Sequence, residues 1–245
     1  MRELSKSIVR RRLDSRFSNQ YFVGEGIDIG GKPDPLALYS EFFPLMGSVR
    51  TWDWEDGDAQ DMSSVPDETY TFVHSSHCLE HLVNPKIGLQ NWFRILKPGG
   101  HLIVTVPDED LYEQGVWPST FNLDHKWSFT INKITSWSPV SLNVFDLLGE
   151  LGGAARVMSV QIQDLGYRYS LPRYDQTSSP VSESAIEFIV QKLHAQEIQA
   201  GGYRGEKNQP PEFVRRYLNQ YQIDYKQMKK SNSGAEPFMD EGELR

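Results

Sequence analysis

Hydrophobic and polar positions follow helical spacing in the first 17 residues and strand-like spacing from residue 24 onward. Residues 3–17 carry apolar residues at helical intervals, which predicts a short amphipathic helix. Six later apolar runs predict strands: GIDIG, SVRTWDW, YTFVHSS, HLIVTVP, RVMSVQIQD and AIEFIVQKL. Helix-like stretches such as CLEHLVNPKIGLQNWFRIL separate several of them. Strands that alternate with helices predict an α/β fold with a mostly parallel central sheet and helices on both faces.

The same pattern divides the chain into three parts. We expect an N-terminal helical arm over residues 1–23 and the main domain over residues 24–200. Residues 201–245 begin with a turn-rich linker, GGYRGEKNQPP, and continue into a predicted helix, EFVRRYLNQYQIDYKQM, and a polar tail that we expect to be mobile. Arg10, Arg11 and Arg12 are expected on a solvated face of the arm helix.

Composition narrows the classes of function. A chain of 245 residues has room for one sizeable core, and its net charge of -8 argues against general nucleic-acid binding. Cys78 is the only cysteine, which excludes a disulfide framework and a thiolate zinc cluster and fits a reducing compartment. No apolar run approaches the roughly 18 residues that a membrane span needs. We therefore expect a cytoplasmic protein without a membrane span.

The stretch GIDIGGKPDP, residues 26–35, reads as a strand that ends in a glycine turn. A phosphate-binding P-loop is disfavoured because Pro33 stands where a hydroxyl should bind magnesium. A dinucleotide fingerprint needs its glycines after the strand, whereas Gly24 and Gly26 precede the apolar residues. The remaining pattern is an acid near the strand end followed by Gly30 and Gly31, where missing side chains let a ligand approach the backbone.

Together with this turn, three further blocks resemble class I S-adenosylmethionine-dependent methyltransferases, in the order of that family. FVHSSHCLEHLVNP resembles the family's fourth strand and the helix start after it, LKPGGHLIVTVPD its fifth strand, and DWEDGDAQDM its acidic segments. The resemblance covers residues 24–108. It implies a Rossmann-like methyltransferase fold for residues 24–200 and S-adenosylmethionine (SAM) as the cofactor.

Two departures from the family's pattern change what we expect. The usual third glycine of the turn is replaced around Pro33 and Asp34, so the turn should follow a modified path. Between Asp53 and Asp58 there is no room for the helix and third strand that the family inserts. The sheet is therefore expected to be one strand short.

The resemblance also suggests which residues contact the adenosine part of the cofactor. Asp53 follows the second strand about 20 residues after the glycine turn, a position from which a carboxylate can accept hydrogen bonds from both ribose hydroxyls. Asp58 and Ala59 would recognise the adenine edge through a side-chain oxygen and a backbone N–H. The alternatives are a solvated acid at Asp53 and an acidic turn at Asp58.

A second group is implied at the methionine end. Asp28 would face the amino-acid part of the cofactor, directly or through water, while Gly30 and Gly31 permit close approach. Ser75 ends the predicted fourth family strand, and its backbone carbonyl could bind the ammonium group. The alternative is a turn that needs glycine for its own geometry.

Candidate catalytic residues follow the last predicted parallel strand, where the family builds its acceptor pocket. His125 in STFNLDHKWSFT titrates near neutrality and is our candidate for the general base. Asp108 could orient an acceptor hydroxyl. A packed histidine and a turn-capping aspartate are the structural alternatives. His77 and His81 have helical metal-ligand spacing, but HCLEH lacks the H-E-x-x-H order, and we predict no metal.

These observations favour a SAM-dependent methyltransferase that methylates an oxygen of a small-molecule or glycan acceptor. Acidic net charge and polar, aromatic segments after the last parallel strand suit such acceptors better than bulk nucleic acid. Two alternatives stay open: a nicotinamide-dependent sugar oxidoreductase, and an inactive cofactor-binding or scaffold domain with a degraded glycine motif.

Overall fold

In the computed structural model, residues 3–131, 133–203, 220 and 222–229 are described. Their strands are β1 Gly24–Ile29, β2 Met46–Trp52, β3 Tyr70–Ser76, β4 Leu96–Pro107, β5 Ser128–Thr130, β6 Ser141–Asn143, β7 Ala155–Gln163 and β8 Ala185–Lys192. The α-helices are α1 Leu4–Arg11, α2 Pro85–Arg94, α3 Val144–Gly149 and α4 Ala195–Gln199. Short helical turns lie between them, of which η3 Trp54–Asp56, η4 Leu79–His81 and η5 Glu109–Glu113 border the site.

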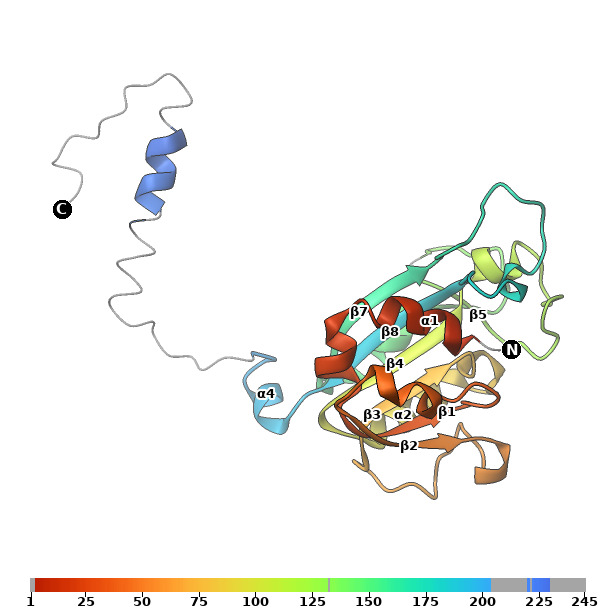
Figure 1. The fold of residues 1–245 in the computed structure, drawn as a ribbon, viewed down its shortest axis with the longest axis horizontal. Helices are drawn as coiled ribbons and strands as arrows, with labels where there is room; N and C mark the ends of the chain where they lie inside the picture. The colour runs from red at the N-terminus through yellow and green to blue at the C-terminus, as the bar shows by residue number, and fades with distance from the viewer. Residues whose placement is uncertain (1–2, 132, 204–219, 221, 230–245) are drawn as a thin grey trace. The chain divides into compact units, whose positions relative to one another are not determined.

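The main sheet has the strand order β2-β1-β3-β4-β8-β7 (Figure 1). The first four strands are parallel, and β8 pairs antiparallel with both β4 and β7. All six predicted strands are present in this sheet. The predicted α/β fold with a mostly parallel sheet is therefore confirmed.

Strand β2 forms one edge of the sheet within the described part of the chain. After β2 the chain passes through η3 and a loop and returns as β3 on the other side of β1. Within the described residues the chain forms no strand between β2 and β3, as the short distance between Asp53 and Asp58 predicts.

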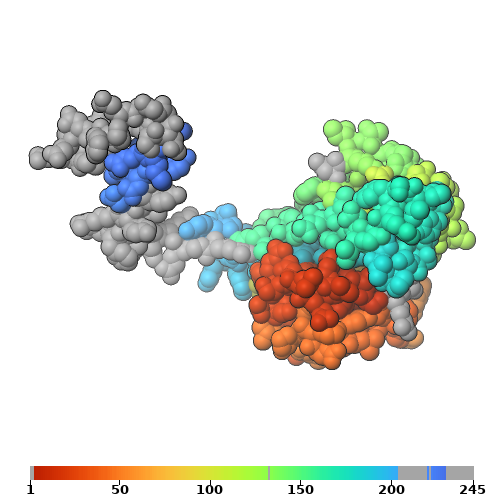
Figure 2. Space-filling view, turned by 45° about the horizontal axis from the view of Figure 1, so that its top comes forward, coloured from red at the N-terminus to blue at the C-terminus, as the bar shows by residue number. Residues whose placement is uncertain are grey.

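Helices cover both faces of the sheet. Helix α1 lies across one face (Figure 1), and the core residues show that α2 and α3 pack on the other. On the α1 face, apolar residues of the helix, Leu4 and Ile8, are buried in one cluster with strand residues such as Phe72, Ile103 and Ile189. The opposite face buries intervening strand residues such as Val73 and Val104 against residues of α2 and α3, among them Leu89, Trp92 and Leu147. Figure 2 shows the N-terminal segment, in red, filling the surface between the orange and teal segments.

The expected solvated face for the arginines of α1 is wrong for Arg10 and Arg11. Arg11 is 0% exposed and donates to Glu187 of β8 from Nε at 2.9 Å and from Nη2 at 2.5 Å. Arg10 also pairs with Glu187, at 2.7 Å. Arg12 is exposed, as expected. The helix turns two arginines toward the sheet because β8 carries a buried acid on that face.

By internal contacts the chain separates into residues 1–203 and 204–245. In the second unit, residues 222–229 are helical, overlapping the predicted helix at residues 212–228. The predicted tail from residue 230 onward lies outside the described residues. No described helix is both long enough and apolar enough to cross a membrane.

Candidate functional site

Two cavities open at the carboxyl ends of β1, β2 and β3, the edge at which parallel α/β sheets bind ligands. The larger cavity, about 710 Å³, is lined by residues that include Asp53 after β2 and Cys78 after β3. The smaller cavity, about 150 Å³, is bordered by Gly31 and, from the start of α1, by Glu3. Both cavities are lined by Gly30, Lys32, His77 and His81, so they adjoin each other.

Asp53 lies where the sequence predicts an acid for a ribose. It follows β2 directly, caps η3 through Trp54 N–H at 2.9 Å, and accepts Lys32 N–H at 3.1 Å. These bonds fix the carboxylate between the ends of β1 and β2 while a carboxylate still has lone pairs for hydroxyl donors. Asp53 lines the larger cavity.

Asp58 and Ala59 also line the larger cavity. Asp58 is exposed, and its Oδ1 accepts Gln60 N–H at 2.8 Å, which makes it part of a turn. The Ala59 carbonyl accepts the Trp92 indole N–H at 2.7 Å, so helix α2 holds this loop. The structure thus brings the three predicted adenosine contacts to one cavity.

Asp28 is buried, and both of its carboxylate oxygens accept bonds from protein groups. Oδ2 accepts Leu36 N–H at 2.7 Å, and Oδ1 lies 2.6 Å from His74 Nδ1. His74 Nε2 lies 3.0 Å from Nη1 of Arg11, which can only donate, so Nε2 must accept and Nδ1 carries the hydrogen. Asp28 borders the smaller cavity as part of a relay that reaches Glu187 through His74 and Arg11.

Gly30 and Gly31 are required by contacts within the protein. Gly30 has φ +73°, and a Cβ there would lie 2.7 Å from Cβ of Cys78. A Cβ at Gly31 would lie 2.4 Å from Oδ2 of Asp28. Packing alone explains both glycines, although they also border the cavities. Ser75 lies inside the sheet, where its hydroxyl donates to the Ile29 carbonyl at 3.0 Å. It is not among the described residues that line either cavity.

His125 is buried at the smaller cavity. Its Nδ1 lies 2.7 Å from Oε1 of Glu113, a carboxylate that can only accept, so Nδ1 carries a hydrogen and Nε2 is the nitrogen that has the lone pair when the ring is neutral. The ring packs against Tyr112 and His81, with both centroid distances 5.0 Å. Glu113 thereby orients the predicted base.

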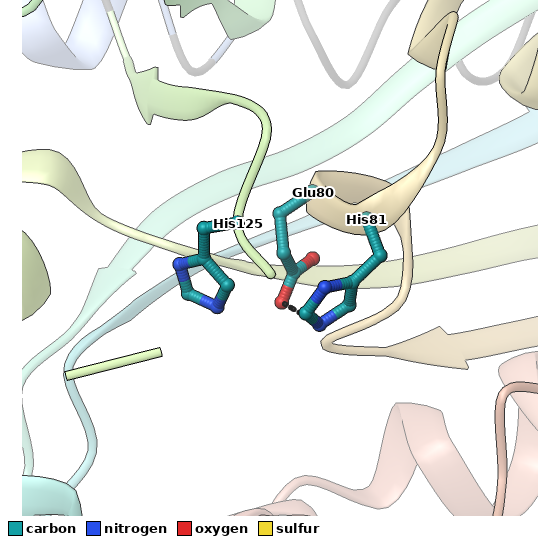
Figure 3. Close-up of side chains that lie close together, drawn as sticks. All are labelled: Glu80, His81 and His125. Carbon is teal, nitrogen blue, oxygen red and sulfur yellow. Dashed lines mark ion pairs between the residues drawn. The ribbon is translucent and has the colours of Figure 1, made fainter. Parts of the chain in front are cut away.

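Glu80 lies beside this histidine and is 0% exposed (Figure 3). Burial by itself raises the pKa of Glu80, but the neighbouring His77, His81 and His125 outweigh it and hold the pKa below its ordinary value. Burial lowers the pKa of His77, while Glu80 raises it, and the net pKa of His77 lies above its ordinary value. A negative carboxylate therefore lies against the cavity wall.

Asp108, the second predicted catalytic residue, is not brought into either cavity. Its Oδ1 accepts the N–H groups of Asp110 and Leu111, both at 3.0 Å, so it caps η5. Burial raises the pKa of Asp108 to about 6, despite these backbone bonds. The structure therefore gives Asp108 the turn-capping position that the sequence left as its alternative.

Sequence reasoning missed several residues of the site. Trp54 is 92% exposed at the larger cavity, and Glu113 and His74 hold His125 and Asp28. Trp54 could have been selected because it follows the ribose acid directly. Glu113 carried no signal, since its pairing with a histidine 12 residues later depends on how η5 folds back.

The parallel strands and the cavities at their carboxyl ends define an α/β protein of the class that binds ligands at this edge of the sheet. A family model described as a methyltransferase domain matches residues 14–144, just over half of the chain. The chain therefore belongs to the methyltransferase-domain family. Among the functions left open by the sequence, this assignment selects the SAM-dependent methyltransferase.

One solved structure supports the fold, and others are more distantly similar. The SAM-dependent methyltransferase of Archaeoglobus fulgidus superimposes with a TM-score of 0.51 at 16% identity, over 78% of this chain and 95% of that chain. For the SAM-dependent methyltransferase of Aquifex aeolicus the TM-score is 0.45 at 13% identity, over 77% and 89% of the two chains. For a SAM-dependent methyltransferase of Methanosarcina mazei the TM-score is 0.44 at 16% identity, over 76% of this chain and 97% of that chain. No curated protein matches the chain significantly.

The residues of the larger cavity fit SAM. A volume of about 710 Å³ lies within the range of roughly 300–1,000 Å³ that holds cofactor-sized ligands. Asp53 offers acceptors for ribose hydroxyls, and Trp54 offers an exposed aromatic face beside it. When bound, SAM supplies a methyl group already activated by its positive sulfur.

Proposed function

We propose that this chain methylates a hydroxyl oxygen of a small-molecule or glycan acceptor bound in the smaller cavity. The observation that carries the proposal is His125, whose Nε2 lone pair is set by Glu113 at the wall of that cavity. A hydroxyl oxygen must lose its proton during methylation, and the neutral form of a histidine oriented in this way can accept it.

The size and lining of the smaller cavity support this acceptor class. A cavity of about 150 Å³ accommodates a group of roughly benzene size, so one ring of a small molecule or a terminal sugar fits. Asn122, Tyr112 and Glu3 line it with polar groups that hydroxyls can bond. The shared border with the larger cavity would bring acceptor and methyl donor together, which supplies much of the rate through orientation.

In this proposal Asp53, Asp58 and Ala59 hold the adenosine part of SAM. Asp28 acts at the methionine end through the turn that it fixes, together with Gly30 and Gly31. The Ser75 carbonyl stays the proposed ammonium acceptor, with Ser76 and His77 as the neighbouring residues that border the cavity.

Transfer of radiolabelled methyl from SAM to a panel of phenols, sugars and amines tests the acceptor class. We expect label on hydroxyl acceptors, and His125→Asn should lower kcat by about 10²–10⁴-fold with unchanged affinity for S-adenosylhomocysteine. His194→Asn, an exposed histidine away from both cavities, is the control. Labelling of amines alone, or full turnover by His125→Asn, would contradict the proposal.

A further inference from the structure

Glu80, His81 and His125 point toward one place beside the smaller cavity (Figure 3). Each offers one ligand atom, and these atoms all lie within 4.8 Å of one another. Glu80 and His81 come from η4, and His125 comes from the segment after η5. Two separate segments thus bring two imidazoles and a carboxylate together.

Glu80 is buried beside histidines but without the hydrogen bonds that a buried carboxylate usually has. It is 0% exposed, and neither of its oxygens has a hydrogen-bond partner among the described residues. His77 Nδ1 lies 3.4 Å from Oε1, and His81 Nε2 lies 4.0 Å away. Burial of an unsatisfied carboxylate is costly, so the site favours a cation at the unbonded oxygens.

Outer carboxylates hold both histidines in the orientation of metal ligands. His125 Nδ1 bonds Glu113 at 2.7 Å, and His81 Nδ1 lies 3.0 Å from Oδ2 of Asp124. Histidines that bind metals usually donate their other ring N–H to a carboxylate or carbonyl, which leaves the second nitrogen for the ion. Here Nε2 is left on both rings.

We propose that Glu80, His81 and His125 bind one divalent transition-metal ion, with open coordination positions toward the smaller cavity for an acceptor oxygen. Two imidazoles and one carboxylate suit ions such as Mn²⁺, Fe²⁺, Co²⁺ and Zn²⁺. Three ligand atoms at tetrahedral angles and about 2.1 Å from one ion are about 3.4 Å apart, against separations of up to 4.8 Å here. Side-chain movements of less than about 1 Å therefore close the site around the ion.

Binding of an acceptor oxygen at the open coordination positions rests on the proposed function, whereas binding of the metal ion itself does not. In the metal-free protein, Nε2 of His125 accepts the acceptor's proton. In the metal-bound protein that lone pair holds the ion, whose charge lowers the pKa of a bound hydroxyl so that its proton leaves to solvent. Both forms promote loss of the same proton.

Metal binding can be measured without an acceptor. Tag-free protein is stripped with a chelator, dialysed and titrated with Mn²⁺, while electron paramagnetic resonance follows free Mn²⁺ and melting curves follow Tm. We expect one ion per chain and a rise in Tm. Glu80→Gln should weaken binding at least about 10-fold, and Glu113→Gln, which removes the negative charge of the outer acceptor, by about 10–100-fold. His194→Asn should bind Mn²⁺ like the wild type.

Two outcomes would overturn the metal site: no saturable Mn²⁺ binding by the wild type, or equal binding by Glu80→Gln and wild type. Titration of every variant with S-adenosylhomocysteine reports on the cofactor site and the fold. Cofactor binding without Mn²⁺ binding rejects the metal site alone. Mn²⁺ binding without cofactor binding or methyl transfer rejects the proposed function and leaves the metal site standing.

Discussion

Replacement of Arg11 by methionine tests whether the N-terminal helix is held by a buried charge network. The guanidinium donates to Glu187, to Thr105 Oγ1 at 3.2 Å and to His74 Nε2 at 3.0 Å. Methionine fills a similar volume and removes all of these donors. Glu187 would then keep Arg10 as its remaining described partner.

The expected cost follows from the burial of the pair. Removal of one partner from a buried ion pair costs about 3–5 kcal/mol, because the other charge stays buried. Since Arg10 still pairs with Glu187, we expect Arg11→Met to lower the free energy of unfolding by about 3 kcal/mol. Arg12→Met is the matched control. Arg12 is exposed and lies 4.3 Å from the Phe42 ring centre, a contact worth about 1 kcal/mol or less.

Urea denaturation of the wild type, Arg11→Met, Arg12→Met, Glu187→Gln and the double variant Arg11→Met/Glu187→Gln measures these costs. We expect the double variant to be more stable than the sum of the two single losses predicts, by about 1 kcal/mol or more. Burial raises the pKa of Glu187, but Arg11 and Arg10 lower it to about 2 from 4.5. This depressed pKa gives a stabilisation present above pH 4.5 and lost as the pH falls toward 2. In Arg11→Met the folded-state pKa of Glu187 should lie closer to 4.5, so this loss should be smaller and complete at a higher pH.

The reasoning would be refuted if Arg11→Met cost no more than Arg12→Met. It would also fail if the losses of Arg11→Met and Glu187→Gln were additive, because groups in one network should couple.

Three further predictions concern the cofactor site and η5. Asp53→Ala should weaken S-adenosylhomocysteine binding about 10–100-fold without unfolding the protein, as calorimetry can measure; equal affinity would remove Asp53 from the site. Gly31→Ala should cost about 1–3 kcal/mol in thermal unfolding because its Cβ meets Asp28, whereas Gly149→Ala, where a Cβ meets nothing within 4 Å, should cost nothing. The raised pKa of Asp108, about 6 against 3.8, means that stability from this group is complete at low pH and is lost as the pH rises through 6. Between pH 4 and 7.5 the wild type should therefore lose up to about 3 kcal/mol of unfolding free energy through this group, and Asp108→Asn should not show that loss. Urea midpoints measured across this pH range check the prediction, and the same pH dependence in both proteins would contradict it.

Much of the fold was predictable because strand periodicity and turn chemistry are local. The six strands of the main sheet follow from short apolar runs, and the missing strand follows from the short distance between Asp53 and Asp58. The larger cavity was predictable for the same reason, since its residues come directly after predicted strands.

The smaller cavity was harder to predict because its residues meet only through tertiary structure. Glu80 and His125 are 45 residues apart, and the segment between them contains α2, β4 and η5. Ser75 illustrates a second limit. Successive strand residues face opposite sides, so a shift of one position at the end of β3 decides whether Ser75 or Ser76 borders the cavity.

The buried polar row on the α1 face explains why the arginines of the arm were misread. Asp28, His74, Thr105 and Glu187 lie on neighbouring strands, with Asp28 paired to His74 and Thr105 paired to Glu187. A polar residue in each of four apolar strands is typical of a solvated sheet face, and arginines in a helix are typical of a solvated helix face. Each pattern alone indicates solvent, but two such faces of opposite charge can cover each other. Arg11 bonds three of these four residues directly and reaches Asp28 through His74, so the helix that sequence reasoning treated as a separate arm supports the turn beside the proposed cofactor site.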